Sequence, residues 1–101
     1  MAEAYNLPVV GQLVRSIAGR DHGKFYLVYR VEGNRVLLVD GRSRLTANPK
    51  VKNPCHLQKS RLVAEEFRLK AAGGRLTPED IRAELNRLLQ TNPDEEALDN
   101  V

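Results

Sequence analysis

Residues 25–40, FYLVYRVEGNRVLLVD, contain the pattern that decides the fold of this chain. Two runs rich in β-branched, aromatic and aliphatic residues, 25–32 and 35–40, flank the dipeptide Gly33-Asn34. Both residues of this dipeptide tolerate the positive φ angles that tight hairpin turns demand, so the combination is a strong hairpin signal. The sequence therefore predicts a β-hairpin with its turn at Gly33-Asn34.

Neither predicted strand of this hairpin alternates cleanly between apolar and polar residues. In the first strand, Leu27 and Tyr29 fall on one face while Tyr26 and Val28 fall on the other, and residues 36–39 of the second strand are all apolar. A strand that is apolar on both faces needs cover on both faces. We therefore expect a small sheet that curls over a core on one side and is covered by another element on the other.

Further β segments are predicted on both sides of the hairpin. Residues 11–18, GQLVRSIA, mix β-branched and polar residues and end at Gly19, which is typical of a strand. Residues 41–61 are irregular and basic, and two Asn-Pro pairs break any long element there. We expect only short strands in this segment, at 44–47 and 56–58.

Beyond residue 61 the apolar spacing becomes helical. A first short helix is predicted from four apolar residues: Leu62, Val63, Phe67 and Leu69. It should end at Gly73-Gly74, since glycine suits a left-handed C-terminal cap. A second helix should begin after Thr77, which is followed by proline and by Asp80 as the acid of a capping box. Its apolar stripe comprises Ile81, Leu85, Leu88 and Leu89.

The overall composition is that of one soluble globular domain. The chain has 101 residues, of which 42% are apolar and 29% are charged. It lacks the features of a signal peptide, and no apolar run approaches the roughly 18 residues of a membrane span. A single cysteine, Cys55, cannot form an internal disulfide. We therefore expect a cytoplasmic protein without a membrane partner.

The charges are divided unevenly along the chain. Residues 1–61 hold 11 Lys/Arg and 4 Asp/Glu, a net charge of +7, whereas residues 62–101 hold 5 and 9, a net charge of −4. A polyanion such as nucleic acid would be attracted to the first of these segments. The acidic part is expected to be a solvated helical face and a tail.

Residues 18–24, AGRDHGK, raise three possibilities: a nucleotide-binding loop, a metal or catalytic site, or a turn. A P-loop needs Gly-x4-Gly-Lys-Ser/Thr before a helix, whereas this loop has Gly-x3-Gly-Lys before a strand. A metal site would need Asp21 and His22 to converge with Cys55 or His56, and no ligand spacing supports that. No nucleophile or second carboxylate cluster accompanies this loop. The sequence therefore predicts no metal, no cofactor and no enzyme activity.

Basic residues in three loops could instead form a phosphate-binding face. The candidate RNA-binding residues are Arg20, His22, Lys24, Arg42, Arg44, Lys50, Lys52, His56, Lys59 and Arg61. The same charges could also be scattered solubilising charges, and composition alone does not distinguish the two. The aromatic residues Phe25, Tyr26 and Tyr29 could stack on bases, but core packing is the stronger interpretation for a strand that is apolar on both faces.

Residues 11–41, GQLVRSIAGRDHGKFYLVYRVEGNRVLLVDG, resemble a KOW motif, the strand, glycine-bearing loop and strand unit of SH3-like barrels. Such barrels occur in NusG-type transcription factors and in several ribosomal proteins. The motif glycine would be Gly23, with Gly19 opening the loop as a second structural glycine. Over about residues 10–60 the chain is similar to short bacterial KOW-domain RNA-binding proteins, which are related to KOW-bearing large-subunit ribosomal proteins of archaea and eukaryotes. It departs from them at 48–57, NPKVKNPCHL, where two prolines and a cysteine interrupt the expected run of lysines.

The resemblance implies a mainly β fold with C-terminal helices. We expect a small SH3-like barrel of about five strands at 7–61, a helical extension packed on it at 62–92 and a flexible acidic tail at 93–101. The implied function is non-catalytic RNA binding by a monomer, with ribosomal RNA, the ribosome or ribosomal proteins as partners. Seven residues receive an RNA-contact role from the resemblance: Arg20, His22, Lys24, Arg42, Arg44, Lys50 and Lys52. The alternative is an SH3-like protein-interaction module of a translation or transcription complex.

Overall fold

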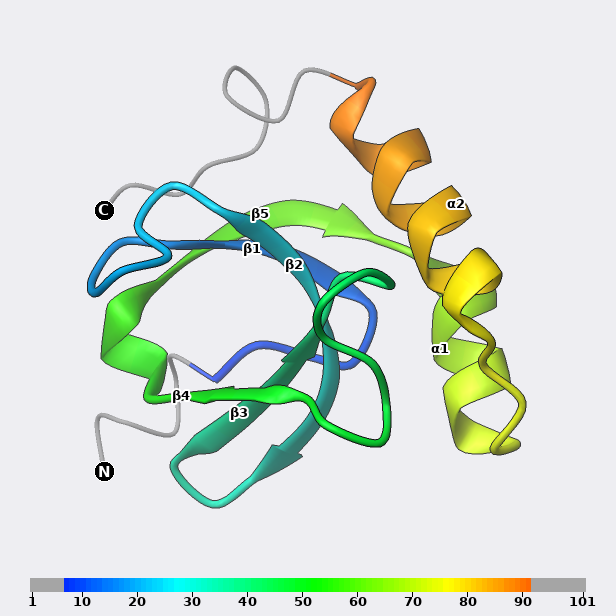
Figure 1. The fold of residues 1–101 in the computed structure, drawn as a ribbon, viewed down its shortest axis with the longest axis horizontal. Coiled ribbons are helices and arrows are strands. Elements are labelled where there is room, and N and C mark those ends of the chain that lie inside the picture. The colour runs from blue at the N-terminus through cyan, green and yellow to red at the C-terminus, as the bar shows by residue number, and fades with distance from the viewer. Residues whose placement is uncertain (1–6, 92–101) are drawn as a thin grey trace.

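The computed structural model describes residues 7–91, which form a five-stranded antiparallel sheet and two C-terminal helices (Figure 1). In chain order the elements are β1 (Gln12–Ser16), β2 (Phe25–Glu32), β3 (Arg35–Val39), β4 (Lys50–Lys52), the 3-10 turn η2 (Pro54–His56), β5 (Leu57–Val63), α1 (Glu65–Ala72) and α2 (Pro78–Leu89). The strand order is β4-β3-β2-β1-β5. A mainly β fold with C-terminal helices is thus confirmed, while the predicted acidic tail at 93–101 lies outside the described residues.

The predicted hairpin is the centre of the sheet. β2 and β3 pair antiparallel up to the partners Glu32 and Arg35, and Gly33 in the turn between them has a φ of 63°. The pairing register shifts between Val28 and Arg30, which marks an irregularity in β2. β1 then adds to the other edge of β2, so the three segments with the clearest β pattern in the sequence are adjacent in space.

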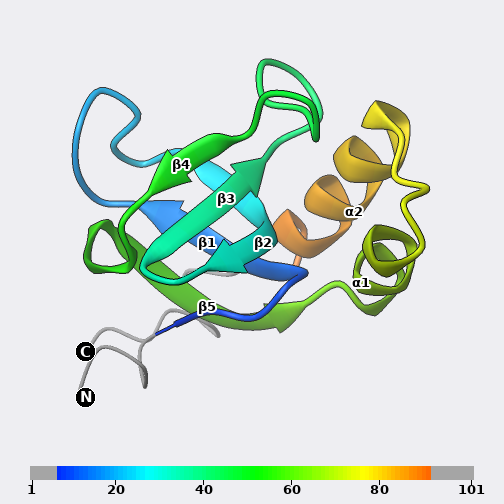
Figure 2. The same ribbon diagram turned by 90° about the horizontal axis from the view of Figure 1, so that it is seen from below.

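The two apolar faces of the sheet bury two separate clusters, as expected from the sequence. One cluster is formed by side chains of β1, β2, β3 and the start of β5: Val14, Tyr26, Val28, Val36, Leu38 and Leu57. The other joins the opposite face of the sheet to the helices: Leu13, Leu27, Val39, Ala64, Phe67, Ile81, Leu85 and Leu88. Figure 2 shows both helices together on one side of the sheet. The helices therefore cover the sheet, and their apolar stripe is used within the chain.

The elements after β3 differ from the predicted ones. The strand predicted at 44–47 is wrong, because the chain forms turns there and pairs with β3 only at β4. The short strand predicted at 56–58 is instead the seven-residue β5. Leu62 and Val63 belong to β5 and not to a helix, because the end of β5 pairs with the start of β1. Leu69 of α1 is 68% exposed and contributes nothing to the core.

Helix α2 begins as its sequence predicts. The Thr77 side chain accepts a hydrogen bond from the Asp80 amide, and the Asp80 carboxylate accepts one from the Thr77 amide, which completes a capping box. The turn between the helices contains Gly74 with a φ of 70°. Lys70 of α1 donates to Asp80 at 2.9 Å, so the cap of α2 also contacts the first helix.

The start of α2 packs directly on the turn after β3. A Cβ atom added to Gly41 would lie 2.8 Å from the Pro78 carbonyl oxygen and 2.9 Å from the Arg82 amide nitrogen. Gly41 also has a φ of 80°, and its carbonyl accepts a 2.7 Å hydrogen bond from Arg82 Nη1. This contact fixes the loop between β3 and β4 to the helices, and Figure 2 shows that loop beside α2.

Candidate nucleic-acid interface

The loop between β1 and β2, residues 17–24, is a tightly hydrogen-bonded turn. Gly19 and Gly23 have φ values of 85° and 91°, a conformation that glycine adopts without strain. Gly23 N donates to Ser16 O at 2.7 Å and Lys24 N to Asp21 O at 2.9 Å, which closes the base of the loop. The backbone of the loop therefore has a defined shape, with both glycines at positions of positive φ.

Asp21 anchors this loop from inside. Its carboxylate accepts hydrogen bonds from Tyr26 Oη at 2.7 Å and Ser16 Oγ at 2.9 Å, and it pairs with Lys52 Nζ at 3.0 Å. The Asp21 side chain is only 12% exposed. A carboxylate with three donors in a sheltered position holds the backbone around it in one conformation.

The protonation states of this cluster also indicate a structural role. Burial alone would raise the pKa of Asp21, but the hydrogen bonds from Tyr26, Lys52 and Ser16 outweigh it and hold that pKa well below its usual range. Burial and the hydrogen bond to Asp21 raise the pKa of Tyr26. A general acid or base at neutral pH needs a pKa near the working pH. Asp21 and Tyr26 are both far from that condition.

Lys52 belongs to the same cluster of polar side chains as Asp21. Its Nζ atom donates to the Ala18 carbonyl at 2.7 Å in addition to pairing with Asp21, and its side chain is 9% exposed. β4, an edge strand of the sheet, thereby reaches the loop beyond β1, which agrees with the curled sheet in Figure 1. Lys52 was predicted as a phosphate contact, but the structure places its ammonium group inside the protein.

The loop between β3 and β4 has a buried carboxylate of its own. Asp40 Oδ1 accepts from the backbone amides of Arg42 and Arg44 at 2.8 and 2.9 Å, and Oδ2 pairs with Lys24 Nζ at 2.8 Å. The Asp40 side chain is 5% exposed, and its bonds to Lys24, Arg42 and Arg44 lower its pKa against the opposing effect of burial. Lys24 also donates to Ser43. The two basic loops are thus joined side by side.

The structure brings some of the predicted residues together and separates others. Arg20, His22 and Lys24 on the first loop are exposed, and Arg42 on the second loop is exposed as well. The neighbouring candidates that are only partly exposed are Arg44 on the second loop and Lys50 in β4.

The remaining candidates are His56 in the η2 turn and Lys59 and Arg61 in β5. Ile17 N donates to His56 O at 3.0 Å, so the η2 turn borders the first loop on its other side. Lys59 pairs with Val14 in the middle of β1, and Arg61 lies still further from the loop. Of these three residues, His56 is the one placed at the same end of the sheet as the two basic loops.

Sequence reasoning did not assign the anchoring roles of Asp21, Asp40 and Lys52. The role of Asp40 had a local signal, since aspartate in a turn commonly accepts a hydrogen bond from the amide two residues on. The contact between Asp21 and Lys52 joins residues far apart in the chain and has no local signal. It arises only when the curled sheet brings β4 to the loop after β1.

Within residues 7–91, no three His, Cys, Asp or Glu residues are grouped so that they could hold a metal ion. No helix in the same range has the length and apolar character needed to cross a membrane.

No protein-family model matches the sequence, and no curated protein gives a significant match to it. The resemblance to KOW-domain proteins therefore remains a prediction.

Proposed function

We propose that this chain is a non-catalytic RNA-binding protein whose basic loops, residues 17–24 and 40–44, contact the phosphates of a structured RNA. In this proposal the sheet is an SH3-like barrel of the KOW type, and the protein acts as a cytoplasmic monomer on ribosomal RNA. The observation that carries the proposal is the ion pair between Lys24 and Asp40, which holds two basic loops next to each other.

Preorganisation supports this function. Each loop is held by an internally hydrogen-bonded carboxylate, Asp21 or Asp40, so the arginines that project from it start from a fixed backbone. Binding then requires ordering of the side chains but not of the loops, which lowers its entropic cost. Arg20 and Arg42 can each donate two hydrogen bonds to one phosphate. A Cβ atom added to Gly23 would have no atom within 4 Å from the other residues of 7–91, its chain neighbours aside, so a ribose-phosphate chain could approach the backbone there.

The local electrostatics also favour a polyanion. Asp21 and Asp40 are the acidic residues of these loops, and each is paired internally with a lysine. Their charges are compensated within the protein, so the exposed arginines dominate the outward field. Phosphate contacts of this kind read the shape of a folded RNA and not its sequence.

The strand arrangement is compatible with the proposed barrel. The strands up to β4 follow one another across the sheet, and β5 returns to pair with β1. The sheet encloses one apolar cluster on its inner side, as a small barrel does.

The first test removes two of the exposed arginines. Arg20→Ala combined with Arg42→Ala is expected to weaken binding of a structured ribosomal RNA fragment about tenfold or more at low salt, because two charge-assisted contacts are lost. The slope of log affinity against log salt concentration should also become shallower by about 1 to 2. Fluorescence anisotropy across a salt series measures both quantities.

The matched control is Arg75→Ala combined with Arg87→Ala, which removes the same charge from the helical side of the protein. This control should keep most of the affinity. Equal weakening by both double variants would show that only net charge matters, and an unchanged affinity in the loop variant would show that the loops are not the site.

A further inference from the structure

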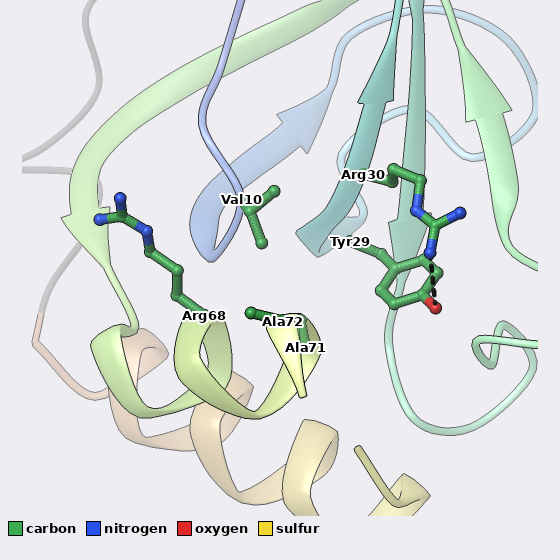
Figure 3. Close-up of a pocket in the computed structure, with 6 residues that line it drawn as sticks. All are labelled: Val10, Tyr29, Arg30, Arg68, Ala71 and Ala72. Carbon is green, nitrogen blue, oxygen red and sulfur yellow. Dashed lines mark hydrogen bonds between the residues drawn. The ribbon is translucent and has the colours of Figure 1, made fainter. Parts of the chain in front are cut away.

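A groove with a volume of about 360 Å³ opens between α1 and the second half of β2. Its lining residues are Val10, Tyr29, Arg30, Arg68, Ala71 and Ala72 (Figure 3). The basic loops lie at the opposite end of β2, which begins next to the first of them. This groove is therefore a second surface, separate from the proposed RNA interface.

The middle of the groove is apolar. Figure 3 shows Val10, Ala71 and Ala72 between the two arginines, and their small side chains leave the space open. Two exposed apolar residues are adjacent in sequence to the lining: Val9 is 51% exposed and Leu69 is 68% exposed. The volume of the groove is at the lower end of the range for ligand pockets, so it can hold one or two side chains of a ligand. Burial in the middle of the groove would stabilise an apolar side chain of a ligand more than a polar one.

An arginine lies at each end of the groove. Arg30 stacks over the Tyr29 ring, with its guanidinium carbon 5.1 Å from the ring centre. Its ion pair with Glu32 spans 3.7 Å, and the pair between Arg68 and Glu65 spans 3.6 Å. All four side chains in these pairs are more than half exposed, so both pairs are weak. Each guanidinium can therefore turn to a carboxylate of a ligand, for which its planar donor set is well suited.

We propose that this groove binds a short acidic segment of a partner protein, in which one apolar side chain lies between carboxylates. The basic, apolar and basic order along the groove is complementary to an acidic, apolar and acidic order in the ligand. Among residues 7–91, no acidic residue is part of the lining. A nucleic acid fits less well, because the alanine and valine floor between the arginines offers no partner for phosphate.

The test is a titration of the ¹⁵N-labelled full-length protein with a blocked synthetic peptide, Ser-Glu-Glu-Leu-Glu-Glu-Ser, followed by amide chemical shifts. Saturable shifts are expected at Val10, Tyr29, Ala71 and Ala72, with a dissociation constant of about 0.1 to 1 mM, as for a short flexible ligand. A peptide with serine in place of leucine, and one with glutamine in place of each glutamate, should each bind at least about fivefold more weakly.

Two protein variants separate the groove from general charge. Arg30→Gln combined with Arg68→Gln should weaken peptide binding at least about fivefold, since both end contacts are lost. Arg75→Gln combined with Arg87→Gln removes the same charge outside the groove and should leave binding unchanged. Equal effects of the two double variants would overturn the proposal, as would the absence of saturable shifts up to about 5 mM peptide.

Two further results would assign the groove to a different occupant and overturn the proposal. One is a single-stranded RNA oligonucleotide that shifts the same four amides at a lower concentration than the peptide does. The other is a shift of those amides caused by Leu98→Ser in the absence of any peptide, which would point to residues 92–101 of the chain itself.

Discussion

Asp21→Ala is expected to lower the free energy of unfolding by about 3 to 5 kcal/mol, because it removes one partner from an ion pair that is largely sheltered from water. The variant leaves Lys52, whose side chain is 9% exposed, without its carboxylate. It also removes the acceptor for the Tyr26 hydroxyl and one of two acceptors for the Ser16 hydroxyl, which keeps the Ala18 carbonyl. Urea denaturation at neutral pH, followed by circular dichroism, measures this loss.

Two controls identify its cause. Asp21→Asn keeps the size and one acceptor oxygen, so it should cost less than Asp21→Ala. Adding Lys52→Met to Asp21→Ala removes the orphaned ammonium group and should restore part of the stability. A loss below about 1 kcal/mol for Asp21→Ala would show that the cluster is not an anchor.

The cluster around Asp21 also determines whether the protein gains or loses stability as the pH falls. A carboxyl group whose pKa is lower in the folded state than in the unfolded state stabilises the fold fully above its unfolded pKa, about 3.9 for aspartate. That stability is lost as the pH falls through the folded pKa. Asp21 and Asp40 both have lowered pKa values, so the wild-type protein should lose stability as the pH falls below about 4. In the Asp21→Asn variant, the free energy of unfolding should fall less steeply over this acidic range.

Gly41→Ala is expected to destabilise the protein by about 2 to 5 kcal/mol, the sum of a positive φ for a residue with a side chain and an overlap with packed atoms. Its methyl group would lie less than 3 Å from backbone atoms of Pro78 and Arg82. The start of α2 must then move away, and the hydrogen bond from Arg82 to the Gly41 carbonyl is lost with it. Chemical denaturation measures the effect.

Gly23→Ala is the matched control for this substitution. Gly23 also has a positive φ, 91°, but an added Cβ would lie more than 4 Å from every other described residue except its chain neighbours. Gly23→Ala should therefore lower the free energy of unfolding only by the cost of a positive φ, about 1 to 2 kcal/mol. Equal losses in the two variants would mean that the contact between the turn and α2 contributes nothing to stability.

The parts of the fold that were predicted correctly have local causes. The hairpin depends on Gly33-Asn34 between two β-rich runs, and α2 depends on its own capping box and apolar spacing. In both cases the residues that fix the structure are neighbours in the chain. Local patterns of this kind can be recognised without knowledge of the rest of the fold.

The incorrect predictions concern residues whose structure depends on distant partners. Leu62 and Val63 have helical spacing with Phe67, yet they belong to β5 because Val63 pairs with Gln12 of β1. β4 is only three residues long and exists because β3 offers an edge to pair with. Pairing with a distant strand overrides weak local preference in such segments.

The candidate site was predictable in outline and not in detail. The loop around Gly19 and Gly23 was recognised from its glycines and basic residues. The separate role of the two lysines was not, since Lys52 and Lys24 are paired with the carboxylates of Asp21 and Asp40, which they reach only in the folded chain. The exposed arginines are left as the main candidates for phosphate contact.

RNA binding by the two basic loops is tested most directly by a map of amide chemical shifts when a structured ribosomal RNA fragment is added to the ¹⁵N-labelled protein at low salt. The largest shifts are expected in residues 18–24 and 40–44, and they should disappear as salt is raised. Shifts concentrated on α1 and α2, or no shift at any salt concentration, would contradict RNA binding by these loops.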